Sequence, residues 1–160
     1  LAAVLLHSYM VQAALDGEES SDFSLEAALE TAVQMAQSGD LTGFFDPFRG
    51  LEILTPRWRV LLETPRRSAL PEKARALCRY FLDRYYPQAV SDYDLVCRVK
   101  FAVISCIAVS NLPGAFGEIA QLYSKEIEND PENLDALLDA AYENLAFTDR
   151  KLLGMLLGTA

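Results

Sequence analysis

The chain has 160 residues and a formal net charge of −9, and 51% of its residues are hydrophobic. This hydrophobic content excludes a disordered chain, and the acidic balance does not suit a protein that grips nucleic acid by neutralising phosphates. The charge is also uneven, because residues 1–48 hold eight carboxylates and no Lys or Arg, whereas residues 49–84 hold nine basic side chains against four acids. The basic middle is expected to contact the acidic flanks within the fold.

Helical spacing and capping residues predict the elements of the first half. Apolar side chains recur at helical spacing over residues 1–16 and again after Ser24, a typical N-cap residue. Gly39 is expected to stop this second helix. The pair Thr55-Pro56 combines a cap residue with Pro in the first helical position and so predicts another helix start. A packed turn is expected at the aromatic residues Phe44, Phe45 and Phe48.

In the second half, Pro71 and Pro87 are expected to bound one helix, and Asp92 to cap the next. The stretch from Phe101 to Ser110 carries no charge, and a helix that is apolar all round is a buried one. The helix over about 92–110 is therefore predicted to be the centre of the core. A further helix is expected over about 116–128. The start signal Asp130-Pro131-Glu132 predicts the next helix, on which Leu145 is expected to face inward. The cap residue Thr148 predicts a last helix.

No segment alternates apolar and polar residues for long enough to predict a strand. We therefore expect an all-α protein, an irregular bundle of about seven to nine helices around the buried helix at about 92–110. Residues 1–160 are expected to form a single helical domain, with sub-lobes at 1–64 and 65–160 as an alternative. Because the sequence begins with Leu1 and not Met, we expect it to be a piece of a longer protein.

The three cysteines, Cys78, Cys97 and Cys106, include no CxxC pair, and an odd count argues against a secreted disulfide framework. Cys97 and Cys106 are nine residues apart, which places them on opposite sides of one helix. The run Phe101–Val109 is too short to span a bilayer, and the apolar Leu1–Leu15 lacks the basic start of a signal peptide. We therefore predict a cytoplasmic chain that binds no metal, no membrane and no nucleic acid.

No recognisable catalytic motif is present. His7 is the only histidine, and there is no nucleophile elbow, phosphate-binding loop or set of metal ligands at the required spacing. The segment Arg75–Tyr86 is rich in Arg and Tyr, which suits either an anionic ligand or ordinary helix packing with arginine stems along the surface. A stripe of acids is expected on the outside of the fold: Glu128, Glu132, Asp135, Asp139 and Glu143. The part Glu132–Glu143 suits either a solvated helix face or a docking site for a Lys-rich partner.

Several stretches, read together, carry a family resemblance. They are Arg84-Tyr85-Tyr86, Asp92-Tyr93-Asp94-Leu95, Arg98-Val99-Lys100-Phe101-Ala102-Val103, Ala120-Gln121-Leu122-Tyr123-Ser124-Lys125-Glu126-Ile127-Glu128 and Glu132-Asn133-Leu134-Asp135. This pattern resembles the C-terminal part of bacterial flagellin lysine-N-methylase over about residues 77–140. None of the stretches is a catalytic signature.

The resemblance implies methylation of lysines on flagellin, with S-adenosylmethionine as the methyl donor and an iron–sulfur cluster bound by cysteines near the N-terminus of the full-length family. This sequence lacks that cysteine cluster, so it would be a helical part downstream of it and is not expected to turn over alone. Within the resemblance, Glu126 and Glu128 are expected to position a cationic lysine side chain. The full set of candidate substrate-binding residues is Glu126, Glu128, Arg98, Lys100 and Tyr123.

Two other functions fit the same sequence. The apolar and aromatic content suits a pocket between helices, as in the ligand-binding regulatory domain of a helical transcription repressor. The acidic stripe suits a protein-interaction scaffold. No residue of the chain is assigned a catalytic role under any of the three hypotheses.

Overall fold

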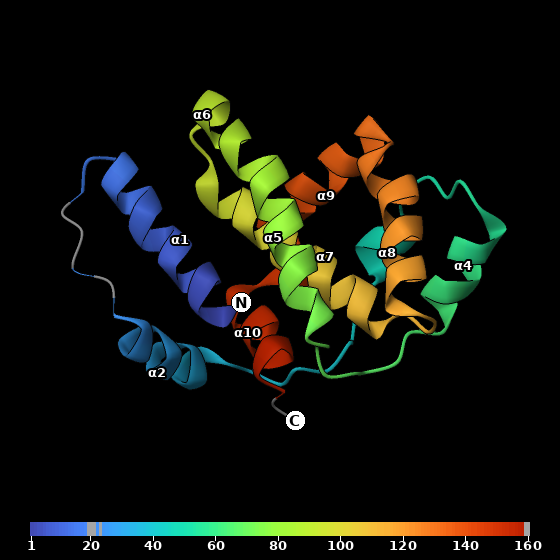
Figure 1. Cartoon of the computed structure of the whole chain (residues 1–160), viewed down its shortest axis with the longest axis horizontal. Helices are drawn as coiled ribbons and strands as arrows, with labels where there is room; N and C mark the ends of the chain where they lie inside the picture. The colour runs from blue at the N-terminus through green and yellow to red at the C-terminus, as the bar shows by residue number, and fades with distance from the viewer. Residues whose placement is uncertain (19–21, 23, 159–160) are drawn as a thin grey trace.

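The computed structural model describes residues 1–18, 22 and 24–158, and every regular element in this part of the chain is helical (Figure 1). The α-helices, in chain order, are α1 Ala2–Leu15, α2 Leu25–Met35, α3 Asp46–Arg49, α4 Pro56–Glu63, α5 Lys73–Tyr85, α6 Ala89–Asp92, α7 Leu95–Asn111, α8 Phe116–Tyr123, α9 Pro131–Glu143 and α10 Asp149–Leu157. Two 3₁₀ turns, Tyr86–Gln88 and Leu145–Phe147, join neighbouring helices, and a π-helical segment, Ser124–Glu128, continues α8. The prediction of an all-α bundle is confirmed.

Helix α7 lies at the centre of the molecule. Fifteen of its seventeen residues, all of which the structure describes, are buried, and α1, α5, α8, α9 and α10 pack around it. The hydroxyl of Ser105, in the uncharged stretch, donates to the carbonyl oxygen of Phe101 at 2.7 Å. The prediction of a buried central helix is therefore confirmed. No helix in the described part of the chain is long and apolar enough to cross a membrane.

The start of α7 differs from the prediction. Its N-cap is Asp94, whose Oδ1 accepts from the backbone N–H of Cys97 at 3.0 Å, and not Asp92. Tyr93 lies between these two aspartates and separates the two helices, because its left-handed backbone conformation ends α6 before α7 begins. Asp92 instead accepts from the backbone N–H of Asp94 at 3.1 Å.

At α10, Thr148 precedes the helix as predicted, but its side chain forms no capping hydrogen bond.

A continuous set of aromatic rings fills the core beside α7. The predicted aromatic turn supplies Phe48, whose ring centroid lies 6.2 Å from Tyr123 and 6.2 Å from Phe147. Tyr123 also meets Trp58 of α4 edge-on at 6.1 Å and Phe81 of α5 at 5.8 Å. Edge-to-face pairs of this kind add to the stabilisation that burial provides. The core thus joins residues from both halves of the chain.

Two further residues differ from their predicted roles. Helix α2 ends at Met35, before Gly39, which instead lies where the chain passes over α10. A Cβ on Gly39 would lie 2.4 Å from the carbonyl oxygen of Gly154, so only Gly fits there. Leu145, predicted to face inward, is 79% exposed, because α9 ends at Glu143 and a 3₁₀ turn follows.

Candidate functional site

The five candidate residues from the sequence fall into two separate groups. Tyr123, Glu126 and Glu128 belong to the end of α8 and its π-helical continuation. Arg98 and Lys100 lie in the first turns of α7, and their ion-pair partners are not among the other three residues. The structure therefore does not assemble the five into one site.

Glu126 is fully buried and is used to hold the start of α4. Its Oε2 accepts from the backbone N–H of Leu54 at 2.8 Å, and its Oε1 accepts from the hydroxyl of Thr55. The side-chain amide of Asn133 donates to the backbone carbonyl of Glu126 at 2.9 Å and to that of Glu52 at 2.8 Å. These bonds give Glu126 a structural role at the junction of α4, α9 and the π-helical segment.

Glu128 is buried too, although it was predicted to lie on the exposed acidic stripe. Its Oε1 accepts from the hydroxyls of Tyr80 at 3.0 Å and Tyr85 at 2.9 Å, and Arg84 Nε lies 3.4 Å away. The physical reason is the π-helical segment, whose wider turn rotates later side chains about the helix axis relative to an α-helix. Burial, and then the hydrogen bond to Glu128, raise the pKa of Tyr85 to about 12 against the lowering effect of Arg84.

Tyr123 completes this internal polar set. Its hydroxyl lies 2.8 Å from Ser105 Oγ on α7, and the ring is fully buried. Burial raises the pKa of Tyr123. Tyr123, Glu126 and Glu128 thus bind other parts of the chain, and a role for them in binding substrate stays a prediction.

Arg98 and Lys100 lie in the first turns of α7, where Arg98 faces Asp92 of α6 and Lys100 faces Asp149 of α10. Arg98 is hydrogen-bonded to Asp92, and Lys100 Nζ lies 3.5 Å from Asp149 Oδ1. The hydroxyl of Tyr9 donates to the second oxygen of Asp149 at 2.6 Å. Burial, followed by this hydrogen bond to a carboxylate, raises the pKa of Tyr9 well above its usual range.

Lys100 forms part of a surface pocket of about 590 Å³, which we call the tyrosine pocket. Three of its lining residues are tyrosines with substantial exposure: Tyr9 of α1 at 40%, Tyr93 at 70% and Tyr142 of α9 at 61%. The remaining lining residues are Gln12, Asp92, Asp94, Val96 and Lys100. The pocket therefore lies where α1, α9 and the first turns of α7 meet.

The backbone at the rim of the tyrosine pocket is held in an unusual conformation. Tyr93 has a φ of 58°, the only positive φ among the non-glycine residues that the structure describes. Gln12 fixes this turn, because its side-chain amide donates to the carbonyl of Tyr93 at 2.8 Å and accepts from the N–H of Leu95 at 2.9 Å. A bulky residue with a left-handed backbone conformation is strained, and this conformation persists only where the surrounding contacts hold it. Gln12 thus presents the Tyr93 ring at the pocket.

The charge around the tyrosine pocket favours a cation. A second depression of about 340 Å³ shares Asp92, Asp94 and Tyr142 with it and adds Asp135 and Asp139, against a single basic residue, Arg98, which is paired with Asp92. Burial opposes ionisation of Asp92, but hydrogen bonds from Asp94 N–H and Arg98 hold its pKa below the usual range. Asp94 forms no ion pair with any residue that the structure describes. Exposed aromatic faces and an unpaired carboxylate are the groups that attract an ammonium ion.

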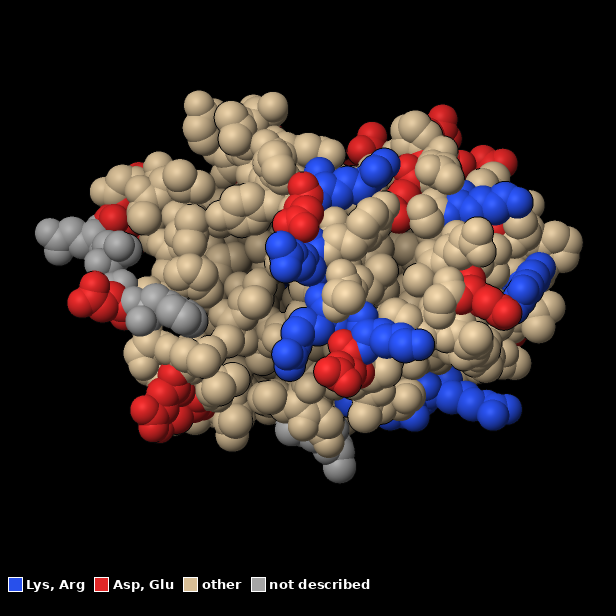
Figure 2. Space-filling model, viewed as in Figure 1, with Lys and Arg blue, Asp and Glu red and all other residues tan. Residues whose placement is uncertain are grey.

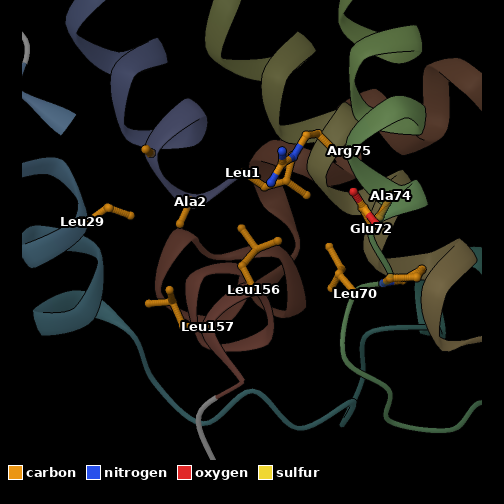
Figure 3. Close-up of a pocket in the computed structure, with 11 residues that line it drawn as sticks. Leu1, Ala2, Leu29, Leu70, Glu72, Ala74, Arg75, Leu156 and Leu157 are labelled. Atoms are coloured by element: carbon orange, nitrogen blue, oxygen red, sulfur yellow. The ribbon is translucent and has the colours of Figure 1, made fainter. Parts of the chain in front are cut away.

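A second pocket, of about 320 Å³, is mostly apolar (Figure 3). Leu29 of α2, Leu70 and two residues of α10, Leu156 and Leu157, contribute side chains to it, with Arg75 of α5 on one side. It offers a surface for apolar groups and holds no cluster of side chains able to perform acid–base chemistry.

No group of three Cys, His, Asp or Glu residues in the described ranges is arranged to hold a metal. Cys78, Cys97 and Cys106 are all buried, and burial is the main reason that the pKa of Cys97 rises to about 12. The described thiols therefore do not fit an iron–sulfur cluster, and S-adenosylmethionine stays an expectation for a longer protein.

Compared with known proteins, the chain matches no family model, no curated protein and no solved structure. The relationship to flagellin lysine-N-methylase therefore stays a prediction based on the stretches quoted above. Lys100 was among the candidate residues from the sequence, but none of the three tyrosines of the tyrosine pocket was. Nothing in the linear order of residues 9, 93 and 142 brings these rings together, and only the packing of α1 and α9 beside the start of α7 does so.

Proposed function

We propose that this chain is the helical substrate-recognition domain of a protein-lysine methylase of the flagellin lysine-N-methylase type. In this proposal the tyrosine pocket receives a lysine side chain of the protein substrate. The methyl transfer itself belongs to another part of a longer protein, and this chain does not turn over alone. Flagellin is the substrate that the family resemblance implies.

The observation that carries the proposal is the combination of three exposed tyrosine rings with acidic side chains around one pocket. A lysine side chain has an apolar stem and a charged end, and these two parts need different surroundings. The rings of Tyr9, Tyr93 and Tyr142 can pack on the apolar stem and offer their faces to the ammonium group. The carboxylate of Asp94 suits the positive charge. Lys100 is already paired with Asp149, which limits its repulsion of an incoming cation.

The resemblance supports the same location. Two of its stretches, Asp92-Tyr93-Asp94-Leu95 and the one that begins at Arg98, supply residues around the tyrosine pocket and its neighbouring depression. The stretch that ends at Glu128 supplies internal hydrogen bonds instead. The resembling segments thus divide between a surface role and a structural one.

The proposal is tested by measuring binding of purified flagellin to the immobilised chain. Tyr142→Ala removes one exposed ring, and Asp94→Asn removes the charge while Asn still caps α7. Each interaction is worth about 1–2 kcal/mol, so each variant should bind about 5- to 30-fold more weakly. Tyr86→Ala and Asp83→Asn, at exposed positions outside the pocket, are the matched controls and should bind like the unmodified chain.

Acetylation of the flagellin lysines should abolish the binding, because it removes the positive charge. Equal binding by the pocket variants and the unmodified chain, with circular dichroism showing intact helices, would reject the proposal. So would full binding of acetylated flagellin.

The apolar pocket of Figure 3 favours a second candidate, a domain that binds a small apolar ligand. This function predicts saturable, single-site fluorescence enhancement of 8-anilinonaphthalene-1-sulfonate. Leu156→Glu should abolish the enhancement, and Tyr142→Ala should leave it unchanged. Flagellin binding that is sensitive to Tyr142 but insensitive to Leu156 would favour lysine recognition instead.

A further inference from the structure

Helix α2 presents most of its apolar side chains to solvent. Ala32 alone among its residues, all of which are described, is buried. Leu25, Leu29 and Val33 are 57%, 42% and 65% exposed and follow one another at intervals of four residues. Residues four apart lie on the same side of a helix, so these three form a continuous apolar stripe.

An exposed apolar stripe on a short helix needs a physical explanation. Helices of this length are marginal in water unless their apolar face is packed. Helix α2 lies at the edge of the molecule against α1 and α10, where Ala32 is buried and the partly buried Met35 packs against the core (Figure 1). Leu29 and Val33 of the stripe line an open surface depression of about 470 Å³, whose lining residues all belong to α2, and Leu29 also lines the pocket of Figure 3. The arrangement suits the apolar face of a second helix.

The charge beside the stripe indicates what kind of helix fits. Glu26 and Glu30 line the same depression beside Leu29 and Val33, and the first 48 residues contain no Lys or Arg. Figure 2 shows no basic side chain over α1 and α2, whereas blue side chains gather over α5. A second copy of α2 would place carboxylates against carboxylates, and a membrane-binding helix would carry basic residues of its own. A helix with lysines or arginines beside its apolar residues would be complementary.

We propose that α2 is a docking site for a basic amphipathic helix of a partner protein. The leucine or valine side chains of that helix pack on Leu25, Leu29 and Val33, and its basic side chains pair with Glu26 and Glu30. This site is separate from the tyrosine pocket, and the proposal does not depend on lysine recognition there.

The test uses the whole chain and a fluorescein-labelled helical peptide of about five turns. The peptide carries leucines at i, i+4 and i+8 with lysines beside them, and a matched peptide has glutamates in place of the lysines. Fluorescence anisotropy should show saturable binding of the lysine peptide, at least about tenfold tighter than that of the glutamate peptide, and the difference should shrink as salt screens the charges.

Two double variants separate the apolar and charged contributions. Leu25→Gln with Val33→Gln changes exposed positions and should weaken binding about tenfold or more, while Val90→Gln, at an exposed apolar residue of α6, should have no effect. Glu26→Gln with Glu30→Gln should remove the preference for the lysine peptide.

The proposal is overturned if neither peptide binds, if both bind equally, or if the α2 variants bind like the unmodified chain. It is also overturned if sedimentation equilibrium shows dimers of the chain that the Leu25→Gln, Val33→Gln variant abolishes, because α2 would then dock a second copy.

Discussion

At the scale of single residues, the two buried glutamates of the π-helical segment are satisfied in different ways. Glu126 accepts from uncharged donors of Leu54 and Thr55, whereas Glu128 accepts from two tyrosine hydroxyls beside Arg84. Buried carboxylates are tolerated only where such donors replace water. These contacts explain why polar residues occur in the middle of an aromatic core.

Tyr123→Phe should lower the free energy of unfolding by about 1 kcal/mol. The ring and its packing are kept, but Ser105 Oγ loses the hydroxyl that lies 2.8 Å away in a site without exposure. Urea unfolding followed by circular dichroism measures the change. Tyr142→Phe removes an exposed hydroxyl and should leave the unfolding midpoint where it is; equal midpoints for both variants would argue against the buried bond.

The raised pKa of Tyr85 predicts a loss of stability at high pH. Its folded value of about 12 exceeds the unfolded value of about 10, so the protonated phenol favours the folded state. This contribution is complete below a pH of about 10 and is lost as the pH rises through about 12. Tyr85→Phe should flatten the decline of the urea midpoint across this window, and an unchanged decline would contradict the assignment.

At the scale of elements, the sequence predicts a helix well where a local signal exists. The cap bonds expected of Ser24, Thr55 and Asp130 are all present, because such caps depend on residues two or three positions away. The uncharged stretch correctly identified α7 as buried. The π-helical segment was not predicted, since nothing in its sequence distinguishes it from a continued α8, and Glu128 was therefore placed on the wrong side.

Gly39 is explained by a contact between elements and not by a helix end. Gly39→Ala should destabilise the fold by about 1–3 kcal/mol, because the new Cβ would lie within 2.4–2.9 Å of backbone atoms of Gly154 and Met155. Thermal unfolding measures this loss.

The control for Gly39 is Gly117→Ala in α8. A Cβ there meets nothing within 4 Å, so this change should stabilise the fold by about 0.5–1 kcal/mol. A Gly39 variant as stable as the unmodified chain would show that the loop moves away from α10 without cost.

At the scale of the whole molecule, the charge distribution along the chain predicts some contacts, whereas the tyrosine pocket depends on how the helices pack. The basic middle of the chain contacts acidic residues of the C-terminal part, as in Arg57–Glu118 and Arg84–Glu128, which the charge distribution made a reasonable expectation. The tyrosine pocket could not be predicted in this way, because it joins residues about eighty and fifty positions apart through helix packing. Of its residues, only Lys100 was a candidate beforehand.

Binding of a lysine side chain in the proposed tyrosine pocket can be observed ring by ring. The most direct test is nuclear magnetic resonance of the chain with isotope-labelled tyrosine rings, titrated with a lysine-containing flagellin peptide. The seven tyrosines serve as internal probes of location. We expect saturable shifts for Tyr9, Tyr93 and Tyr142 and none for the buried Tyr85 and Tyr123. Shifts confined to other tyrosines, or none at saturating peptide, would contradict it.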